Sequence, residues 1–339
     1  MIYLQNGYAC MHDIMNDKQP FIFCIGPRGT GKTYGALLEV LSQKKRIIYL
    51  RRTQTEMNLI TSEITSPFKH LLEDHPEITP VQVKKIADNL AEFYQVENEQ
   101  ENIVGYIAAL STFANIRGVD FSDVGLILYD EFIPEKRSRP IKEEYEALMN
   151  MYETTNRNRE LEGKDPIKLI CLANSNDIAN PIFMGLGVVN RVAKMMLKET
   201  CYYSDPAHNL AIYMLQRSPI SARKKETVLY QLTRGSDFER MAISNIFALD
   251  RSAVRGMPLQ EYKPLVSLGE LLILKHKSRD EYYARCGKPN GTCEVEFTTS
   301  DMDQKRFRLR FAYLYAAYLS GNVIFEDEAS MILFEKIFK

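Results

Sequence analysis

Short apolar runs recur along the first half of the chain, and both alternating sets of positions in each run are mainly apolar. The runs cover residues 21–25, 46–50, 124–129 and 167–173. Such runs are typical of strands that are buried on both faces of a parallel sheet. Apolar residues at helical spacing occur in the stretches 34–42, 141–160 and 188–198. This alternation of elements predicts an α/β fold with a mostly parallel central sheet.

The pattern changes between residues 81 and 109. Three strand-like segments lie close together there, at 83–86, 90–96 and 103–107, and Asp88-Asn89 forms a turn signal between the first two. We expect a small antiparallel insertion beside the parallel sheet. Upstream of it, Thr53 can cap a helix that runs towards Pro67, with a further turn to His75.

The C-terminal half is predicted to contain a linker followed by a smaller α+β domain. Residues 200–235 are predicted to form a helical linker that includes a helix over 207–217 and the basic triplet 223–225. Short strands are then expected at 242–249, 271–276 and 293–297, followed by a final helical pair. The predicted domains are therefore 1–199, 200–235 and 236–339.

Composition narrows the class of protein. The 339 residues are 45% hydrophobic and 26% charged, with a net charge of −1, as in ordinary globular proteins. Contact with nucleic acid would therefore depend on local basic patches, because the net charge of the whole chain is too small to attract it. The N-terminus shows no leader pattern, and the apolar stretch 311–325 is short and interrupted, so we expect a protein of a reducing cytoplasm without a membrane span.

The strongest motif follows the first apolar run. Gly26-Pro27-Arg28-Gly29-Thr30-Gly31-Lys32-Thr33 matches the phosphate-loop pattern G-x-x-x-x-G-K-[ST] in full. Glycines let backbone N–H groups wrap the phosphates of a nucleoside triphosphate, Lys32 supplies a positive charge, and Thr33 supplies a hydroxyl ligand for Mg²⁺. Arg28 is either a plain surface arginine or a residue that switches between phosphate and a DNA- or subunit-facing partner.

Acidic and amide residues follow two other apolar runs. Asp130 follows the run 124–129 and suits a carboxylate that holds Mg²⁺ through water beside Thr33, while Glu131 can orient and deprotonate the attacking water. Asn174 follows the run 167–173 and can contact the γ-phosphate or that water. Near the N-terminus, Gln5 and its aromatic neighbours either hold an adenine ring or form a surface lead-in segment.

Arginines complete the set of candidates. Arg51 and Arg52 follow the second apolar run, where α/β sheets place ligands, and can reach phosphate or DNA, although a solvated pair is the commoner outcome. Arg157 lies near the end of the helix predicted over 141–160. It either complements the helix dipole, which the residues alone favour, or acts as an arginine finger on the γ-phosphate of a neighbouring subunit.

Four blocks occur in an order that resembles one family. They are GPRGTGKT, RGVDFSDVGLILYDEF, ALMNMYETTNRNRE and LICLANSNDIANP. The chain resembles the DNA-encapsidation ATPases of small short-tailed phages of the Salasmaviridae type, relatives of the terminase motors. The resemblance covers about the first 190 residues and returns near the C-terminus, at YAAYLSGNVIF, which ends at Phe325.

The resemblance implies a function and partners. It implies an ATPase domain of the additional-strand (ASCE) type, a linker, and a C-terminal domain like a vestigial RNase H-like nuclease. Five such subunits form a ring on the portal vertex of an empty procapsid and move double-stranded viral DNA inward with ATP and Mg²⁺. A packaging RNA is a further candidate partner. The site of action would be the host cytoplasm, transiently at the portal, and not the mature virion.

The resemblance also assigns residues. It implies that Lys32 and Thr33 act on the phosphates and Mg²⁺, that Asp130 binds Mg²⁺, and that Glu131 is the catalytic base. Arg157 resembles the trans-acting finger, which reverses the preference drawn from the residues alone. Arg117 falls where relatives carry a second basic residue at the subunit boundary, usually Lys.

Two other functions are alternatives to a DNA-packaging ATPase. One is a terminase whose C-terminal domain also cuts DNA, for which Asp250 is a candidate carboxylate without a convincing second and third. The other is a nucleotide-switched scaffold that moves nothing. The run 305–311 interleaves basic and apolar residues, which predicts a helix with a core stripe and with arginines either in solvent or on DNA, portal or RNA.

Overall fold

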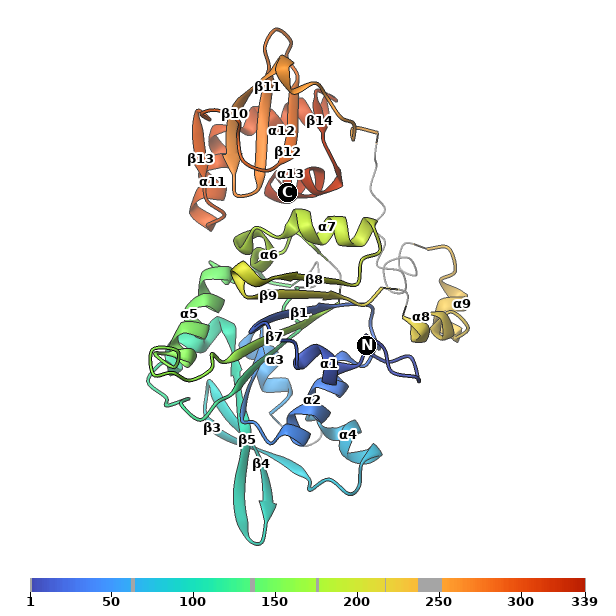
Figure 1. The fold of residues 1–339 in the computed structure, drawn as a ribbon, viewed down its shortest axis with the longest axis vertical. Coiled ribbons are helices and arrows are strands. Elements are labelled where there is room, and N and C mark those ends of the chain that lie inside the picture. Colours follow the sequence, from blue (N-terminus) through green and yellow to red (C-terminus); the bar gives the residue numbers. More distant parts are fainter. Residues whose placement is uncertain are drawn as a thin grey trace. The chain divides into compact units, whose positions relative to one another are not determined.

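The computed structural model describes residues 2–61, 65–134, 138–174, 177–216, 218–236 and 252–338. The chain divides into two compact units that interleave in sequence (Figure 1). Unit 1 comprises Met1–Arg139, Ala147–Asn176 and Thr200–Ile246, and unit 2 comprises Pro140–Glu146, Asp177–Glu199 and Phe247–Lys339.

Unit 1 contains a nine-stranded sheet with the order β3-β4-β5-β2-β6-β7-β1-β9-β8. Its strands are β1 (Phe21–Ile25), β2 (Ile47–Arg51), β3 (Val81–Ala87), β4 (Leu90–Glu97), β5 (Gln100–Ala109), β6 (Leu126–Asp130), β7 (Lys168–Ala173), β8 (Tyr202–Asp205) and β9 (Leu210–Met214). The six strands from β5 to β9 in this order are parallel, and β3, β4 and β8 pair antiparallel. The four apolar runs form β1, β2, β6 and β7, so the predicted parallel centre is confirmed.

The predicted antiparallel insertion is also confirmed, as the hairpin of β3 and β4 and its continuation in β5. Strand β5 then pairs parallel with β2, which joins the insertion to the central sheet without a break. In Figure 1, the β4–β5 hairpin extends beyond the body of the sheet.

Helices of unit 1 follow the amphipathic pattern. They are α1 (Met11–Met15), α2 (Lys32–Gln43), α3 (Gln54–Leu59), α4 (Lys69–Asp74), the 3₁₀ segments η2 (Leu110–Ile116) and η3 (Pro206–His208), α8 (Pro219–Lys224) and α9 (Val228–Leu232). Helix α5 (Glu144–Asn156) spans the boundary between the units. Thr53 caps α3 as predicted, through a capping box with Glu56. Ala36, Leu37 and Val40 of α2 are buried in the core that covers one face of the sheet.

The helix predicted over 207–217 is wrong. This stretch contains β9, which is buried along its whole length and pairs with β1. Five consecutive apolar residues suit a strand with two covered faces, and Asn209, with a φ of 55°, breaks any helix at its start. Residues 202–214 therefore belong to the sheet of unit 1, and only the later part of the predicted linker carries the helices α8 and α9.

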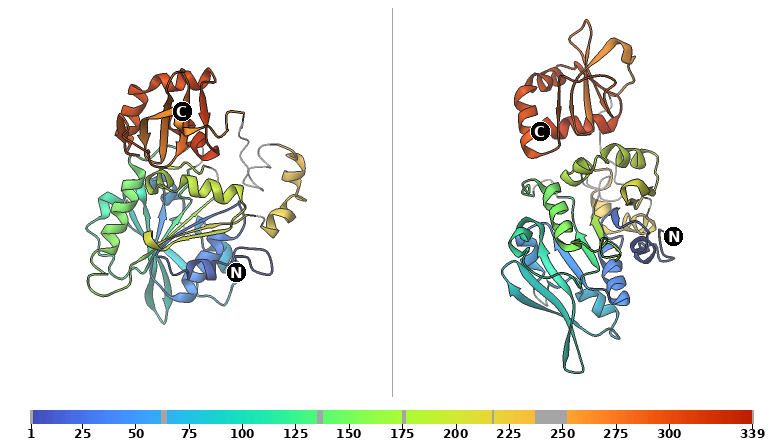
Figure 2. Two further views of the ribbon diagram at one scale, coloured as in Figure 1. Left: turned by 45° about the horizontal axis from the view of Figure 1, so that its top comes forward. Right: turned by 60° about the vertical axis from the view of Figure 1, so that its left-hand side comes forward.

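Unit 2 contains a five-stranded sheet with the order β13-β10-β11-β12-β14. Its elements are α6 (Pro181–Leu186), α7 (Val189–Leu197), η4 (Leu259–Glu261), β10 (Tyr262–Leu268), β11 (Leu271–His276), β12 (Tyr282–Cys286), β13 (Val295–Phe297), α11 (Asp301–Arg310), α12 (Ala312–Leu319), β14 (Val323–Phe325) and α13 (Glu328–Phe338). Figure 2 shows the red helices α11, α12 and α13 gathered on one side of the orange strands. Unit 2 is thus an α+β unit.

The core stripe predicted in the last helices is present. Phe307, Phe311 and Leu314 are buried, whereas Arg306 and Arg310 are exposed. The strand predicted over 242–249 and Asp250 lie outside the described residues. In the described part of the chain, no helix is long and apolar enough to cross a membrane.

Candidate active site

The phosphate loop connects β1 to α2, which begins at Lys32. Gly29 and Gly31 have φ values of 68° and 81°, in the left-handed region that favours glycine. Gly26 is needed for another reason, because a Cβ there would collide with the side chain of Leu215. The glycines of the motif therefore allow the loop to curve, as the sequence predicts, and Gly26 also permits close packing against Leu215.

Lys32 points back into its own loop. Its Nζ donates to the carbonyls of Gly26 at 3.0 Å and Pro27 at 2.9 Å, and to Asn174 Oδ1 at 3.3 Å. Burial lowers the pKa of the ammonium to about 8, while the nearby carboxylates of Asp130 and Glu131 oppose this shift. The positive form therefore still predominates at neutral pH, and it is held by groups that a phosphate can replace.

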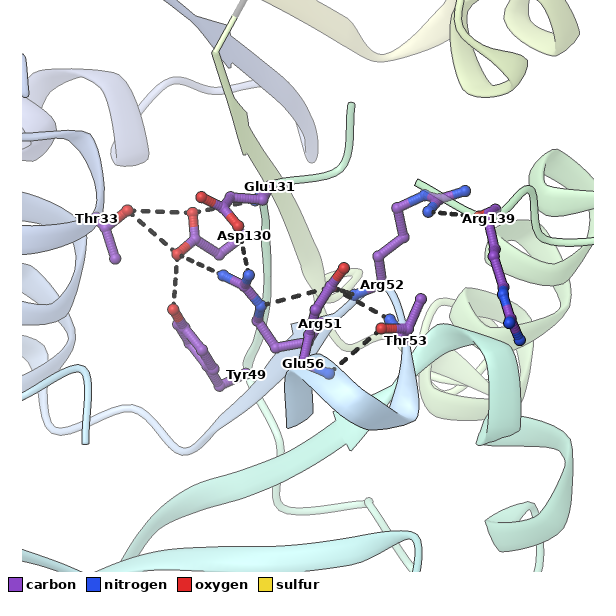
Figure 3. Close-up of polar contacts among 9 residues, drawn as sticks. All are labelled: Thr33, Tyr49, Arg51, Arg52, Thr53, Glu56, Asp130, Glu131 and Arg139. Atoms are coloured by element: carbon purple, nitrogen blue, oxygen red, sulfur yellow. Dashed lines mark hydrogen bonds and ion pairs between the residues drawn. The ribbon is translucent and has the colours of Figure 1, made fainter. Parts of the chain in front are cut away.

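Asp130 is the centre of a buried polar cluster at the carboxyl ends of β2 and β6. Thr33 Oγ1 donates to its two carboxylate oxygens at 3.1 and 3.2 Å, and Tyr49 Oη donates at 2.7 Å. Arg51 Nη1 approaches Asp130 Oδ2 at 3.4 Å. Figure 3 shows Thr33, Tyr49 and Arg51 converging on this carboxylate from two sides.

Glu131 follows directly and has a φ of 57°, a conformation uncommon for residues other than glycine. This turn at the strand end leaves its side chain half-exposed, and its carboxylate pairs with Arg51 Nη2. Arg51 thus binds both acids, and its Nε lies 3.8 Å from Glu56 Oε2. One guanidinium therefore links the two carboxylates to the start of α3.

The electrostatics of the cluster follow from its burial. Burial raises the pKa of the Asp130 carboxyl, and Arg51 and the Tyr49 hydrogen bond oppose this rise. Burial also raises the pKa of Tyr49, with the charge of Asp130 as the next cause. For Arg51, burial disfavours the charged form, but the charges of Asp130 and Glu131 and the hydrogen bond to Glu131 outweigh it and raise the pKa.

A cleft of about 350 Å³ joins these groups. Its lining consists of residues from the phosphate loop, the start of α2 and the ends of β6 and β7: Arg28, Gly29, Gly31, Lys32, Thr33, Tyr34, Asp130, Glu131, Ala173 and Asn174. Three segments that are far apart in sequence therefore meet at one edge of the sheet. The structure places Thr33 beside Asp130 and Asn174 beside Lys32, and the roles assigned to these residues stay predictions.

The oxygen atoms of this cleft fit Mg²⁺. The Thr33 hydroxyl and the Asp130 carboxylate lie within hydrogen-bond distance of each other, and hard oxygen ligands are what this cation prefers. A cation held between them would lie at the N-terminus of α2, where the phosphates are expected.

The N-terminal segment packs on the phosphate loop. Ala9 N donates to the carbonyl of Thr30 at 2.9 Å, and the ring of Tyr8 lies against Gly31. Gln5 is exposed in the turn of a small hairpin closed by the bridge between Tyr3 and Ala9, and it does not line the cleft. The aromatic part of the predicted adenine contact is thus close to the loop, whereas the role of Gln5 stays a prediction.

The burial of the arginine pair argues against the DNA contact predicted for it. Arg52 is 2% exposed and its Nη1 donates to the carbonyl of Arg139 at 3.1 Å. Arg51 is turned to the two acids, as Figure 3 shows. In this arrangement both side chains serve the interior of unit 1.

Arg157 and Arg117 are both exposed, and neither lines the cleft. Arg157 follows the last residue of α5 with a φ of 48°, and its guanidinium reaches Val119 O and Asp120 Oδ1, each at 3.4 Å. Arg117 is exposed at the end of η2, two residues before Val119. The structure therefore brings the two candidate trans-acting arginines to neighbouring loops, and action on another subunit stays a prediction.

Sequence reasoning missed three contacts. It did not assign Tyr49 to the site, it did not pair Arg51 with the acids, and it did not predict that Lys224 Nζ donates to the carbonyl of Arg28 in the phosphate loop. Tyr49 carried the only available signal, since a hydroxyl in a buried strand needs a hydrogen-bond partner.

In the described residues, no group of three or more His, Cys, Asp or Glu could hold a metal ion.

Comparisons with known proteins found one family and several relatives. The family model of the podovirus DNA encapsidation protein (Gp16) matches residues 6–256. The DNA packaging proteins of Bacillus phages phi29 and B103 are 26% identical over 233 residues and 25% identical over 237 residues. Each match covers 67% of this chain and 62% or 64% of the relative, so it spans less than two thirds of either relative.

Two solved structures share the fold over nearly the whole chain. One is the phi28 gp11 DNA packaging motor, with a TM-score of 0.62 and 18% identity over 99% of both chains. The other is the phi29 viral genome packaging motor assembly, with a TM-score of 0.63 and 17% identity over 100% of this chain and 99% of that one. Because the family model matches well over half of the sequence, this chain belongs to the podovirus DNA encapsidation protein (Gp16) family.

Proposed function

We propose that this chain is the ATP-hydrolysing subunit of a motor that moves viral double-stranded DNA into an empty procapsid. One observation carries the proposal: Lys32 and Thr33 of the phosphate loop share a single cleft with Asp130 and Glu131. This set supplies phosphate binding, cation binding and a base for water. The family and the names of its packaging relatives supply the DNA substrate.

The contacts of the cleft assign a role in hydrolysis to each of its residues. The N–H groups of the loop and Lys32 bind the triphosphate, and Thr33 and Asp130 would hold Mg²⁺, which neutralises charge on the phosphates. Glu131 accepts a proton from the attacking water. In the present arrangement Arg51 Nη2 pairs with one oxygen, Oε2, of the Glu131 carboxylate. Asn174, which contacts Lys32, is suited to contact the γ-phosphate.

Ring assembly is the second part of the proposal. Arg157 contacts the backbone two residues after Arg117, and both residues are exposed, so a neighbouring subunit can meet both at once. A site completed by a neighbour uses a heterologous contact, and such contacts close into rings. We assign five subunits, the portal and the procapsid as partners from the family resemblance, with a packaging RNA as a further candidate.

We also propose a more specific fold for each part of the chain. The parallel order β2-β6-β7-β1 supports an additional-strand ATPase domain. We assign residues 236–339 to a vestigial RNase H-like fold without cleavage. The protein would act in the host cytoplasm at the portal vertex and would be absent from the mature virion.

The deciding experiment is packaging into purified procapsids, measured as DNA that becomes resistant to DNase. We expect protection that requires ATP, Mg²⁺ and this protein, and that is lost with Lys32→Ala. ATP hydrolysis that ignores both DNA and procapsids would instead indicate a nucleotide-switched scaffold. Plasmid cleavage in Mg²⁺ or Mn²⁺ would replace the proposal with a nuclease-active terminase.

A further inference from the structure

Lys224 reaches the phosphate loop from a distant part of the chain. It is the last residue of α8, and its Nζ donates to the carbonyl of Arg28. The ammonium also lies against the Cα of Gly29, since any Cβ there would collide with it. Arg28 and Gly29 both line the nucleotide cleft, so this lysine is at its rim.

The sheet explains why α8 lies there. Strand β9 is parallel to β1, so the chain leaves both strands at the same edge. Leu215 N donates to the carbonyl of Ile25 at 2.7 Å, directly before the phosphate loop. Three residues later, Ser218 Oγ donates to the carbonyl of Gly7 at 3.4 Å. The segment that carries Lys224 is thus fixed at both the loop and the N-terminal hairpin.

The positive charges of Lys224 and Lys32 disfavour each other at this rim. Burial lowers the pKa of Lys224, and its charge adds to the burial that lowers the pKa of Lys32. The ion pairs among the described residues include none with Lys224. Two ammonium groups that disfavour each other beside a phosphate loop are stabilised by an anion bound between them.

We propose that Lys224 is a second phosphate-binding lysine, which exchanges the carbonyl of Arg28 for an oxygen of the bound triphosphate. The inference rests on the proposed function, because it assigns a further residue to the same site. Its consequence is regulatory. Helix α8 lies in the segment predicted as a linker, so Lys224 makes the position of that segment depend on the nucleotide.

The first test is chemical footprinting of lysines. An amine-reactive acylating reagent is applied to the wild-type protein with and without Mg²⁺ and a non-hydrolysable ATP analogue, and each lysine is read by mass spectrometry. We expect the analogue to protect Lys224 and to leave the adjacent, exposed Lys225 unchanged. Equal labelling of Lys224 in both conditions overturns the proposal.

The second test is nucleotide affinity, measured by titration with fluorescent ATP and ADP. Lys224→Ala is expected to weaken ATP binding about tenfold, as for loss of a charge-assisted hydrogen bond, and ADP binding less, because ADP carries less charge. Lys224→Arg restores most of the affinity, and Lys225→Ala matches wild type. A circular dichroism spectrum verifies that each variant is folded.

The outcomes separate the two claims. If wild type binds and hydrolyses ATP and Lys224→Ala does so equally well, the inference fails while the proposed function stands. Equal loss of ATP and ADP affinity in Lys224→Ala also overturns it, since that result indicates only a structural clamp on Arg28. If wild type binds no ATP, the proposed function fails and the inference with it.

Discussion

Arg51 and Glu131 form an ion pair across the ends of two adjacent parallel strands, β2 and β6. The same guanidinium lies 3.4 Å from Asp130 Oδ2. One positive charge thus serves the two acids to which we assign different tasks, cation binding and proton abstraction.

Removal of the charge of Arg51 should change the pH dependence of hydrolysis. Arg51 is the largest influence that keeps the pKa of Asp130 down against burial. In Arg51→Met that pKa rises, so the acid limb of the kcat/KM profile for ATP moves to higher pH. Arg46→Met is the matched control, because Arg46 precedes the same strand but pairs with Asp123. An acid limb that stays in place would remove Arg51 from this role.

The role of Glu131 is tested by Glu131→Gln. We expect ATP affinity close to wild type and turnover lower by roughly 10²–10⁴-fold, the usual contribution of a positioned base. Glu99→Gln is a suitable control, since Glu99 is exposed and has a similar φ of 64° but lies in the hairpin between β4 and β5. Steady-state hydrolysis and equilibrium titration measure the two quantities. Unchanged turnover would assign the base to another group.

Tyr49→Phe should destabilise the protein. The hydroxyl donates to a buried carboxylate at 2.7 Å, and its loss leaves that acceptor with one partner fewer. The expected cost is about 1–3 kcal/mol in the free energy of unfolding, measured by urea denaturation. The control is Tyr94→Phe, which removes a hydrogen bond to Gln82 in the β3–β4 hairpin. Equal stability of Tyr49→Phe and wild type would contradict the buried network.

Lys32 should add a pH-dependent part to stability. Its pKa in the fold is about 8, below the ordinary value of 10.5, so the unfolded chain binds more protons between these values. The free energy of unfolding of wild type should therefore rise relative to Lys32→Met from pH 8 to 10.5, by on the order of 3 kcal/mol. Urea denaturation without nucleotide measures the difference. The exposed Lys69→Met should track wild type, and a flat difference for Lys32→Met would show that its ammonium is not buried.

The predictable parts of the site were local in sequence. The phosphate loop and the pair Asp130-Glu131 each carry their chemistry within a few residues, next to an apolar run that identifies the strand. The contacts of Tyr49 and Arg51 depend on β2 lying beside β6, and strand order cannot be read from periodicity. The mistaken helix over 207–217 had the largest effect, since only β9 beside β1 brings Lys224 to the loop.

The trans-acting role of Arg157 requires a mixing experiment. A subunit with Arg157→Ala keeps an intact phosphate loop, and a subunit with Lys32→Ala keeps the finger. Each should be inactive alone, but a mixture should regain part of its ATPase activity, because some interfaces then pair an intact loop with an intact finger. The matched control mixes Arg157→Ala with the double variant Lys32→Ala/Arg157→Ala, which offers no finger and should stay inactive. Rescue in the first mixture and not in the second is the expected result, whereas the absence of rescue at every mixing ratio would place Arg157 outside the active site of the neighbouring subunit.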